Sequence, residues 1–168
     1  MNDVLELERI KKKIADHTQF SLGASLVMDT VPSYERLKIK TELERTAEAI
    51  EILRKNEDPP FGGIYDIREA VDVAMKDGSC NCRELMQCAA LMRGCQNMRR
   101  YLHESGAGVL DELGDSLMID LHLSERIESC ISSSYELYDH ASVQLKSIRR
   151  SIAAVTGDIA AQTARFIQ

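Results

Sequence analysis

The chain has 168 residues and a net charge of −6 at pH 7. This length predicts one domain or a fragment of a larger protein, and it suffices to bury a core. The acidic balance argues against broad coating of nucleic acid but leaves room for a local basic patch. No apolar run approaches the roughly 20 residues of a membrane span, and the N-terminus lacks the apolar core of a secretory signal. We therefore expect a cytoplasmic protein with no membrane partner.

Five cysteines, an odd number, are typical of a reducing compartment. Cys80 and Cys82 stand at a predicted helix start, and Cys88 follows on an apolar helical stripe. Three thiolates without a convincing fourth ligand do not make the tetrahedral site that zinc needs. We interpret the cysteines as reduced packing residues and expect no metal in this chain.

Three helices are predicted before residue 56. Residues 3–16 place apolar side chains at steps of three and four, with the lysine triplet 11–13 on the other, solvated face. Residues 20–29 form a second helical stretch. The third covers residues 34–55, and burial of its apolar stripe, at ~1.5–3 kcal/mol per large aliphatic side chain, outweighs its surface ion pairs. That stripe consists of Ile39, Leu43, Ala47, Ile50 and Leu53.

Residues 59–70 are the sharpest break in the helical pattern. Two adjacent prolines cannot continue the preceding helix, and the glycine pair 62–63 permits positive φ, so a sharp change of direction is predicted. Phe61 and Ile64 are apolar, and we expect them to plug the core because a solvated loop has no use for them. No phosphate-loop spacing is present, so we interpret the run as a packed loop between helices.

Capping patterns mark the next two helices. Asp66 is expected to cap a helix over residues 66–77. Asn81 and Glu84 form a capping-box pattern at the start of a long helix over residues 81–105.

Shorter elements follow. Helices are predicted over residues 109–118 and 124–131, the second capped by Ser124. A serine run at 132–134 predicts a turn, and the alternation over residues 135–138 allows one short strand.

The last helix carries the clearest period in the chain. Apolar residues recur at steps of three and four over three heptads, with one interruption at Gln162, which is typical of a coiled-coil seam. A narrow seam needs one or two partner helices, whereas packing of the helix against its own bundle is the alternative. The seam residues are Leu145, Ile148, Ile152, Val155, Ile159 and Phe166.

A small basic group lies off the seam on the same helix. Lys146, Arg149 and Arg150 are candidates for contact with nucleic acid, because such a ridge can neutralise a few phosphates in a salt-sensitive way. A solvated flank of a coiled coil is the alternative.

Catalytic signatures are missing from the sequence. The four histidines are scattered, and neither a Gly-x-Ser-x-Gly turn nor a Glu-x-x-His pair is present. Nucleophile, base and oxyanion site cannot be assembled, so we predict no catalytic residue and no enzyme activity for this chain alone.

The run Pro-Phe-Gly-Gly-Ile-x-Asp-Ile-Arg-x-Ala over residues 60–70 resembles the N-terminal region of the second bacterial MutS paralogue, the MutS-two family. The likeness extends over nearly the whole chain and returns at residues 139–142. One departure stands out: the family usually has an acidic pair and a glycine in the turn before the last helix, where this chain has three serines and Tyr135.

The resemblance implies an all-α fold, a multi-helix bundle with a core over residues 1–140 and the start of a coiled-coil-like lever helix over 141–168. The family is related to DNA mismatch repair MutS. It suppresses recombination and acts on branched DNA and on stalled ribosomes as a homodimeric, ATP-driven clamp with an endonuclease module. This chain has no positions for the ATPase and nuclease residues, so ATP and Mg are expected only in the full-length family.

The resemblance therefore implies a structural and coupling module without its own catalytic site. The alternative is a free-standing helical interaction module that pairs through its C-terminal seam.

Overall fold

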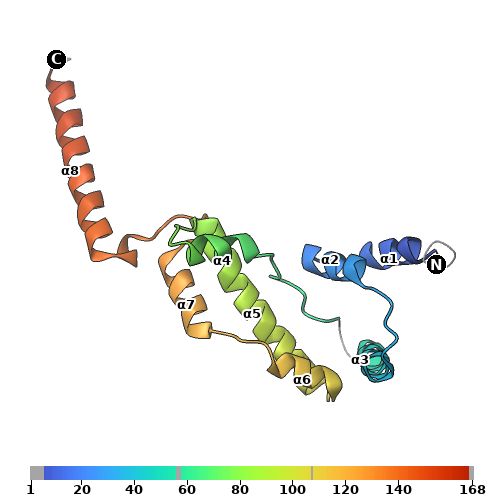
Figure 1. Cartoon of the computed structure of the whole chain (residues 1–168). Helices are drawn as coiled ribbons and strands as arrows, with labels where there is room; N and C mark the ends of the chain where they lie inside the picture. Colours follow the sequence, from blue (N-terminus) through green and yellow to red (C-terminus); the bar gives the residue numbers. More distant parts are fainter. Residues whose placement is uncertain (1–5, 56–57, 107, 167–168) are drawn as a thin grey trace.

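The computed structural model describes residues 6–55, 58–106 and 108–166 and is all-α, as predicted (Figure 1). Within these residues, none of the helices combines the length and hydropathy of a membrane span. The elements are α1 (Leu7–Ala15), α2 (Ser21–Asp29), α3 (Arg36–Lys55), α4 (Arg68–Met75), α5 (Cys82–Glu104), α6 (Val109–Asp115), α7 (Leu121–Cys130), the 3-10 turn η2 (Asp139–Ala141) and α8 (Val143–Phe166).

Helix α5 is the scaffold on which α6 and α7 pack. Its predicted capping box is confirmed: Asn81 Oδ1 accepts the Glu84 N–H at 2.9 Å, and the Glu84 carboxylate accepts the Asn81 N–H at 2.8 Å. The predicted Ser124 cap is wrong, because α7 begins earlier and Asp120 caps it through the Leu123 N–H. Ser124 is instead fully buried and donates to the Ala89 carbonyl of α5 at 3.3 Å.

The strand considered for residues 135–138 is also wrong. The bridge between Ile131 and Leu137 is isolated, with no named strand around it in the described chain. Tyr135 has φ 62 and donates its N–H to the Ser132 carbonyl at 2.9 Å. The tight turn therefore ends the pairing after one bridge.

The backbone of the glycine loop packs directly against the backbone of α5. A Cβ added at Gly63 would lie 3.0 Å from the Ala90 carbonyl, and one added at Gly94 would lie 3.0 Å from the Gly62 carbonyl. Phe61 stands against Phe20, with ring centroids 5.6 Å apart. Phe61 and Ile64 are half-buried rather than enclosed, so they line the contact between loop and helices without forming a closed core.

Asp66 is not the N-cap residue of α4, although its carboxylate accepts the first backbone N–H of that helix, that of Arg68. The helix starts at Arg68, and its N-cap residue, Ile67, makes no side-chain cap. Asp66 also binds the guanidinium of Arg68, 2.5 Å from Nη2. The hydrogen bonds from Arg68 hold the pKa of Asp66 down at about 2.

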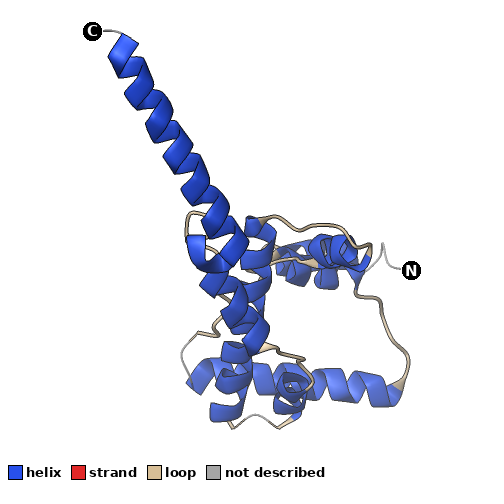
Figure 2. Cartoon of the chain, turned by 90° about the vertical axis from the view of Figure 1, so that its left-hand side faces the viewer, coloured by secondary structure: helices blue, strands red, loops and turns tan. Residues whose placement is uncertain are grey.

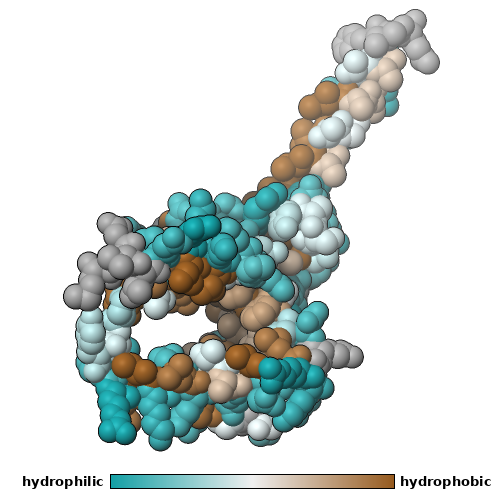
Figure 3. All heavy atoms as spheres, turned by 90° about the vertical axis from the view of Figure 1, so that its right-hand side faces the viewer, coloured by the Kyte–Doolittle hydropathy of each residue, from teal (hydrophilic) through white to brown (hydrophobic). Residues whose placement is uncertain are grey.

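The apolar stripe of α3 is largely exposed, contrary to expectation. Exposed fractions are 39% for Ile39, 64% for Leu43, 45% for Ile50 and 53% for Leu53, and only Ile52 of this helix is buried. Among the described elements, α3 packs mainly on α6. Figure 3 shows apolar side chains along the edges of an opening between the α1–α2 pair and the rest of the molecule. The period predicted an amphipathic helix correctly, but most of its apolar face has no covering helix here.

Lys11 is buried at the contact between α1 and α2, although the sequence placed it on a solvated face. Its ammonium donates to the Met28 carbonyl at 2.9 Å, near the C-terminus of α2, and to Glu8 at 3.1 Å. A cation at the negative end of a helix dipole is favourable.

We expect Lys11→Met to lower the free energy of unfolding by about 1–3 kcal/mol, because it removes the charge-assisted bond between a buried ammonium and the Met28 carbonyl. Urea denaturation followed by circular dichroism measures the change. The exposed neighbour Lys12 provides the control, since Lys12→Met alters the same charge without losing the contact. Equal effects of the two substitutions would refute the role given to Lys11.

Glu48 of α3 joins this helix to α6, because its side chain caps the N-terminus of α6. Its carboxylate accepts the N–H groups of Gly108 and of Leu110, the latter at 2.7 Å. These N–H groups lie at the start of α6, where no intrahelical acceptor is available.

Glu48→Ala should therefore destabilise the docking of α3 on α6 by about 1–2 kcal/mol, the usual value of a helix cap. Hydrogen exchange at the Leu110 amide reports the loss directly. Glu44→Ala, which breaks only an exposed pair with Lys40, should leave that amide unchanged. Protection that survives in Glu48→Ala would contradict this prediction.

Candidate functional site

Helix α8 projects from the body of the molecule (Figures 1 and 2). Its packing contacts are with η2 at its base. Seen from either side, the rest of its length extends away from the other helices. Packing against its own bundle, the alternative that the sequence left open, is not what the structure has.

The seam residues share one side of α8, and the described ones beyond Leu145 are exposed. Leu145, near the base, is half-buried. Exposed fractions then are 49% for Ile148, 59% for Ile152, 57% for Val155 and 59% for Ile159. The side chain of Phe166, the last predicted seam residue, lies outside the described residues. The seam is thus an apolar strip presented to whatever packs beside it.

The three basic candidates do not form one free cluster. Arg149 is held at the base of α8, where Nη1 donates to the Leu137 carbonyl at 3.0 Å and pairs with Asp139 at 2.5 Å. Lys146 and Arg150 are exposed one helical turn apart, and neither has an ion pair among the residues described. Arg149 therefore fixes the base of the helix. Lys146 and Arg150 are the two of the three candidates that remain available to bind an anion such as a phosphate.

Further contacts fix the connection between α7 and α8. His140 Nε2 is 2.8 Å from the Ser129 carbonyl, and its ring stacks on Tyr138 with centroids 5.1 Å apart. Ser142 Oγ accepts the Leu145 N–H at 3.0 Å at the start of α8. Sequence reasoning missed this anchor, because its members are polar residues in a short segment without a period.

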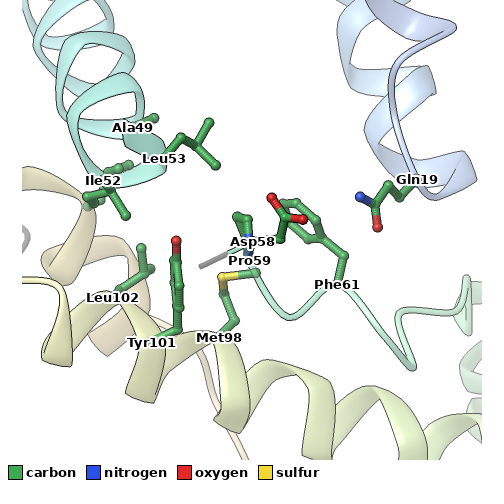
Figure 4. A pocket seen from close by; sticks show the side chains of 11 residues that line it. Gln19, Ala49, Ile52, Leu53, Asp58, Pro59, Phe61, Met98, Tyr101 and Leu102 are labelled. Atoms are coloured by element: carbon green, nitrogen blue, oxygen red, sulfur yellow. The ribbon is translucent and has the colours of Figure 1, made fainter. Parts of the chain in front are cut away.

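An apolar pocket of about 430 Å³ lies between α3, α5, α6 and the proline–glycine loop. Figure 4 shows Leu53, Met98 and Phe61 converging on it. Its polar groups are Gln19, Asp58 and Tyr101. Burial raises the pKa of the Tyr101 hydroxyl, and the negative charge of Asp58 raises it further. No nucleophile stands with a base in this pocket, so its chemistry suits the docking of apolar groups.

The cysteines are all free and half-buried. Burial raises the pKa of the Cys88 and Cys95 thiols, which favours the protonated, unreactive form. Among the described residues, no group of His, Cys, Asp and Glu side chains has the arrangement of a metal site.

Comparison with known proteins shows what the chain is similar to. No family model matches the chain. Proteins named endonuclease MutS2 are similar to it. The one from Clostridium novyi is 32% identical over an alignment of 169 residues, which covers 98% of this chain and 22% of the relative. Those of Ruminiclostridium cellulolyticum and Bacillus cereus are each 32% identical, covering 89% of this chain and 19% and 20% of the relative. The chain is homologous to a segment of MutS2. It spans about a fifth of the length of these MutS2 relatives.

The match confirms the resemblance drawn from the proline–glycine run. In this chain, that run is the loop that crosses α5, and residues 139–142, the second part of the likeness, anchor the base of α8. Both stretches are therefore places where the chain changes direction, and they set the positions of the helices.

Proposed function

We propose that this chain is the helical core and lever module of a MutS2-like, DNA-acting ATPase, and that it transmits motion rather than performing chemistry. The observation that supports this is α8, a 24-residue helix fixed at its base and exposed along its seam beyond Leu145. A helix of this length extends about 36 Å at 1.5 Å per residue. A small rotation at the anchored base therefore becomes a displacement of many ångströms at the tip.

In this proposal, the seam of α8 pairs with a second helix from the remainder of the parent protein. ATP and Mg bind elsewhere in the parent, as does the nuclease module. Homodimer formation, binding of branched DNA, suppression of recombination and action on stalled ribosomes are then properties of the whole assembly in the cytoplasm. This segment contributes the mechanical link between them.

A chimera tests the coupling role. The matching segment of the Clostridium novyi relative is replaced by this chain, and ATP hydrolysis is measured with and without branched DNA. Arg149→Ala, which frees the base of α8 from Leu137 and Asp139, should reduce the stimulation by DNA several-fold and leave basal hydrolysis intact. Arg150→Ala removes the same charge from an unpaired, exposed site, and should have little effect.

Equal losses from both substitutions would point to phosphate contact by the basic group instead of a lever. Stimulation that survives Arg149→Ala unchanged would reject the lever.

The second candidate is a free-standing interaction module, and the half-exposed seam is the observation in its favour. The size of the native product in the source cells, detected with an antibody against this chain, separates the two. A product several times longer supports the MutS2-like module. A product of 168 residues supports partner binding through the seam.

A further inference from the structure

A second cavity lies on the body of the molecule, away from α8. It has a volume of about 400 Å³ and opens between the start of α5, the end of the glycine loop and the turn after α7. Tyr65, Arg83, Gln87, Ser133 and Tyr135 are among its lining residues.

A cation stacked on an aromatic ring forms one wall of this cavity. The guanidinium carbon of Arg83 lies 4.9 Å from the ring centroid of Tyr135. In the part of the chain that the structure describes, Arg83 has no carboxylate partner, whereas Arg93 and Arg149 each have one. Its hydrogen-bond donors are therefore available to an anion, and the stacking holds their plane.

The backbone holds Tyr135 in an unusual conformation. Its φ of 62 lies in the left-handed region, which a bulky L-residue rarely adopts. The turn is closed by the Tyr135 N–H on the Ser132 carbonyl and by the Ser132 N–H on the Glu136 carbonyl, at 2.9 and 2.8 Å. Strained residues of this kind cluster at ligand sites, and here the strain places a ring over Arg83.

The residues that line the cavity carry one positive charge and no negative one. Its lining contains one arginine and no carboxylate, whereas the apolar pocket contains Asp58. Three acids are sequence neighbours of lining residues. Asp66 pairs with Arg68, Glu84 binds the backbone N–H of its own N-cap, and Glu136 lines a neighbouring cavity together with Arg149. Both tyrosines are 44% exposed, so each offers ring surface for stacking.

We propose that this cavity binds a nucleobase that carries a phosphate. The base stacks on the tyrosine rings, Arg83 binds the phosphate, and Gln87 and Ser133 offer hydrogen bonds to the base or sugar. The site goes beyond the coupling role proposed above, because it places an unpaired nucleotide on the body and not on the lever helix.

Binding by the whole chain tests this site. A labelled ten-nucleotide oligo-dT is titrated by fluorescence anisotropy at low salt, and unlabelled thymidine monophosphate is titrated by calorimetry. Binding of oligo-dT alone assigns the site to single-stranded nucleic acid, and binding of both assigns it to free nucleotides as well. Tyr135→Gly should weaken binding about tenfold through lost stacking. Arg83→Ala should do the same and reduce the slope of log affinity against log salt by about 0.7.

Conservative and matched variants guard against loss of fold. Tyr135→Gly suits the observed φ, Arg83→Lys keeps the charge but loses the planar stack, and Tyr65→Phe keeps the ring that Tyr65→Leu removes. Tyr34→Leu and Arg36→Ala change the same residue types at exposed positions near the start of α3, and should leave binding unchanged.

Three results would overturn the proposal: binding of neither probe, binding that Arg83→Ala and Tyr135→Gly leave unchanged, or equal loss in the control variants. Ile152→Glu on the seam of α8 should not alter oligo-dT binding, so failure of this site is distinguishable from failure of the lever.

Discussion

Gly63→Ala is expected to lower the free energy of unfolding by about 2–3 kcal/mol. Gly63 has φ 80, and left-handed backbone costs an L-residue about 1–2 kcal/mol. The added Cβ would also lie 3.0 Å from the Ala90 carbonyl, so the loop must move off α5 at a further cost of about 1 kcal/mol. Urea denaturation followed by circular dichroism measures the change.

Three other glycines separate these two contributions. Gly106 has φ 67 and nothing within 4 Å, so Gly106→Ala measures the backbone cost alone. Gly94→Ala adds crowding against the Gly62 carbonyl at 3.0 Å at a position without a positive φ. The higher helix propensity of alanine offsets part of this destabilisation. Gly62→Ala meets open space and should be close to neutral. If Gly63→Ala were no worse than Gly62→Ala, the loop would not be held against α5 as described.

Local signals predicted the helices and some of their ends. The capping box at Asn81 and Glu84 depends only on residues three apart, so the sequence contains all of its information. Ser124 has the same type of side chain as a cap, but it faces α5, and Asp120 takes the capping role. Which of two polar residues caps a helix is decided by packing against another element, which no local pattern reports.

Periodicity has a similar limit. The stripes of α3 and α8 were both predicted from their spacing, yet the chain covers neither of them fully. A period shows that a helix has an apolar face, but it does not say whether the partner lies in the same 168 residues. The Arg83–Tyr135 stack was not predictable, because its members lie on different elements and the turn geometry brings them together.

Ile152→Glu is expected to abolish a weak association of the chain with itself. Two seams that pair in an isolated sample would each bury four described side chains that are now 49–59% exposed. Each side chain would contribute about half the free energy of burying a large aliphatic side chain, so the two seams together contribute on the order of 6–12 kcal/mol. Association costs an estimated 4–15 kcal/mol, so the net dimer is weak, with a dissociation constant in the micromolar to millimolar range. Sedimentation equilibrium over rising concentration measures it.

A glutamate at position 152 removes one apolar contact from each helix and places two like charges within the pair. Both effects oppose association, and together they should raise the dissociation constant at least about 100-fold, which corresponds to about 2.7 kcal/mol. Ala154→Glu adds the same charge on the side of α8 turned away from Ile152, at about 200° around the helix, and should leave association intact. If both variants weaken the dimer equally, net charge and not the seam governs association. If the unsubstituted chain stays monomeric at every concentration, the seam does not accept a second copy, and its partner must have a complementary sequence, as a helix from another part of a MutS2-like parent would.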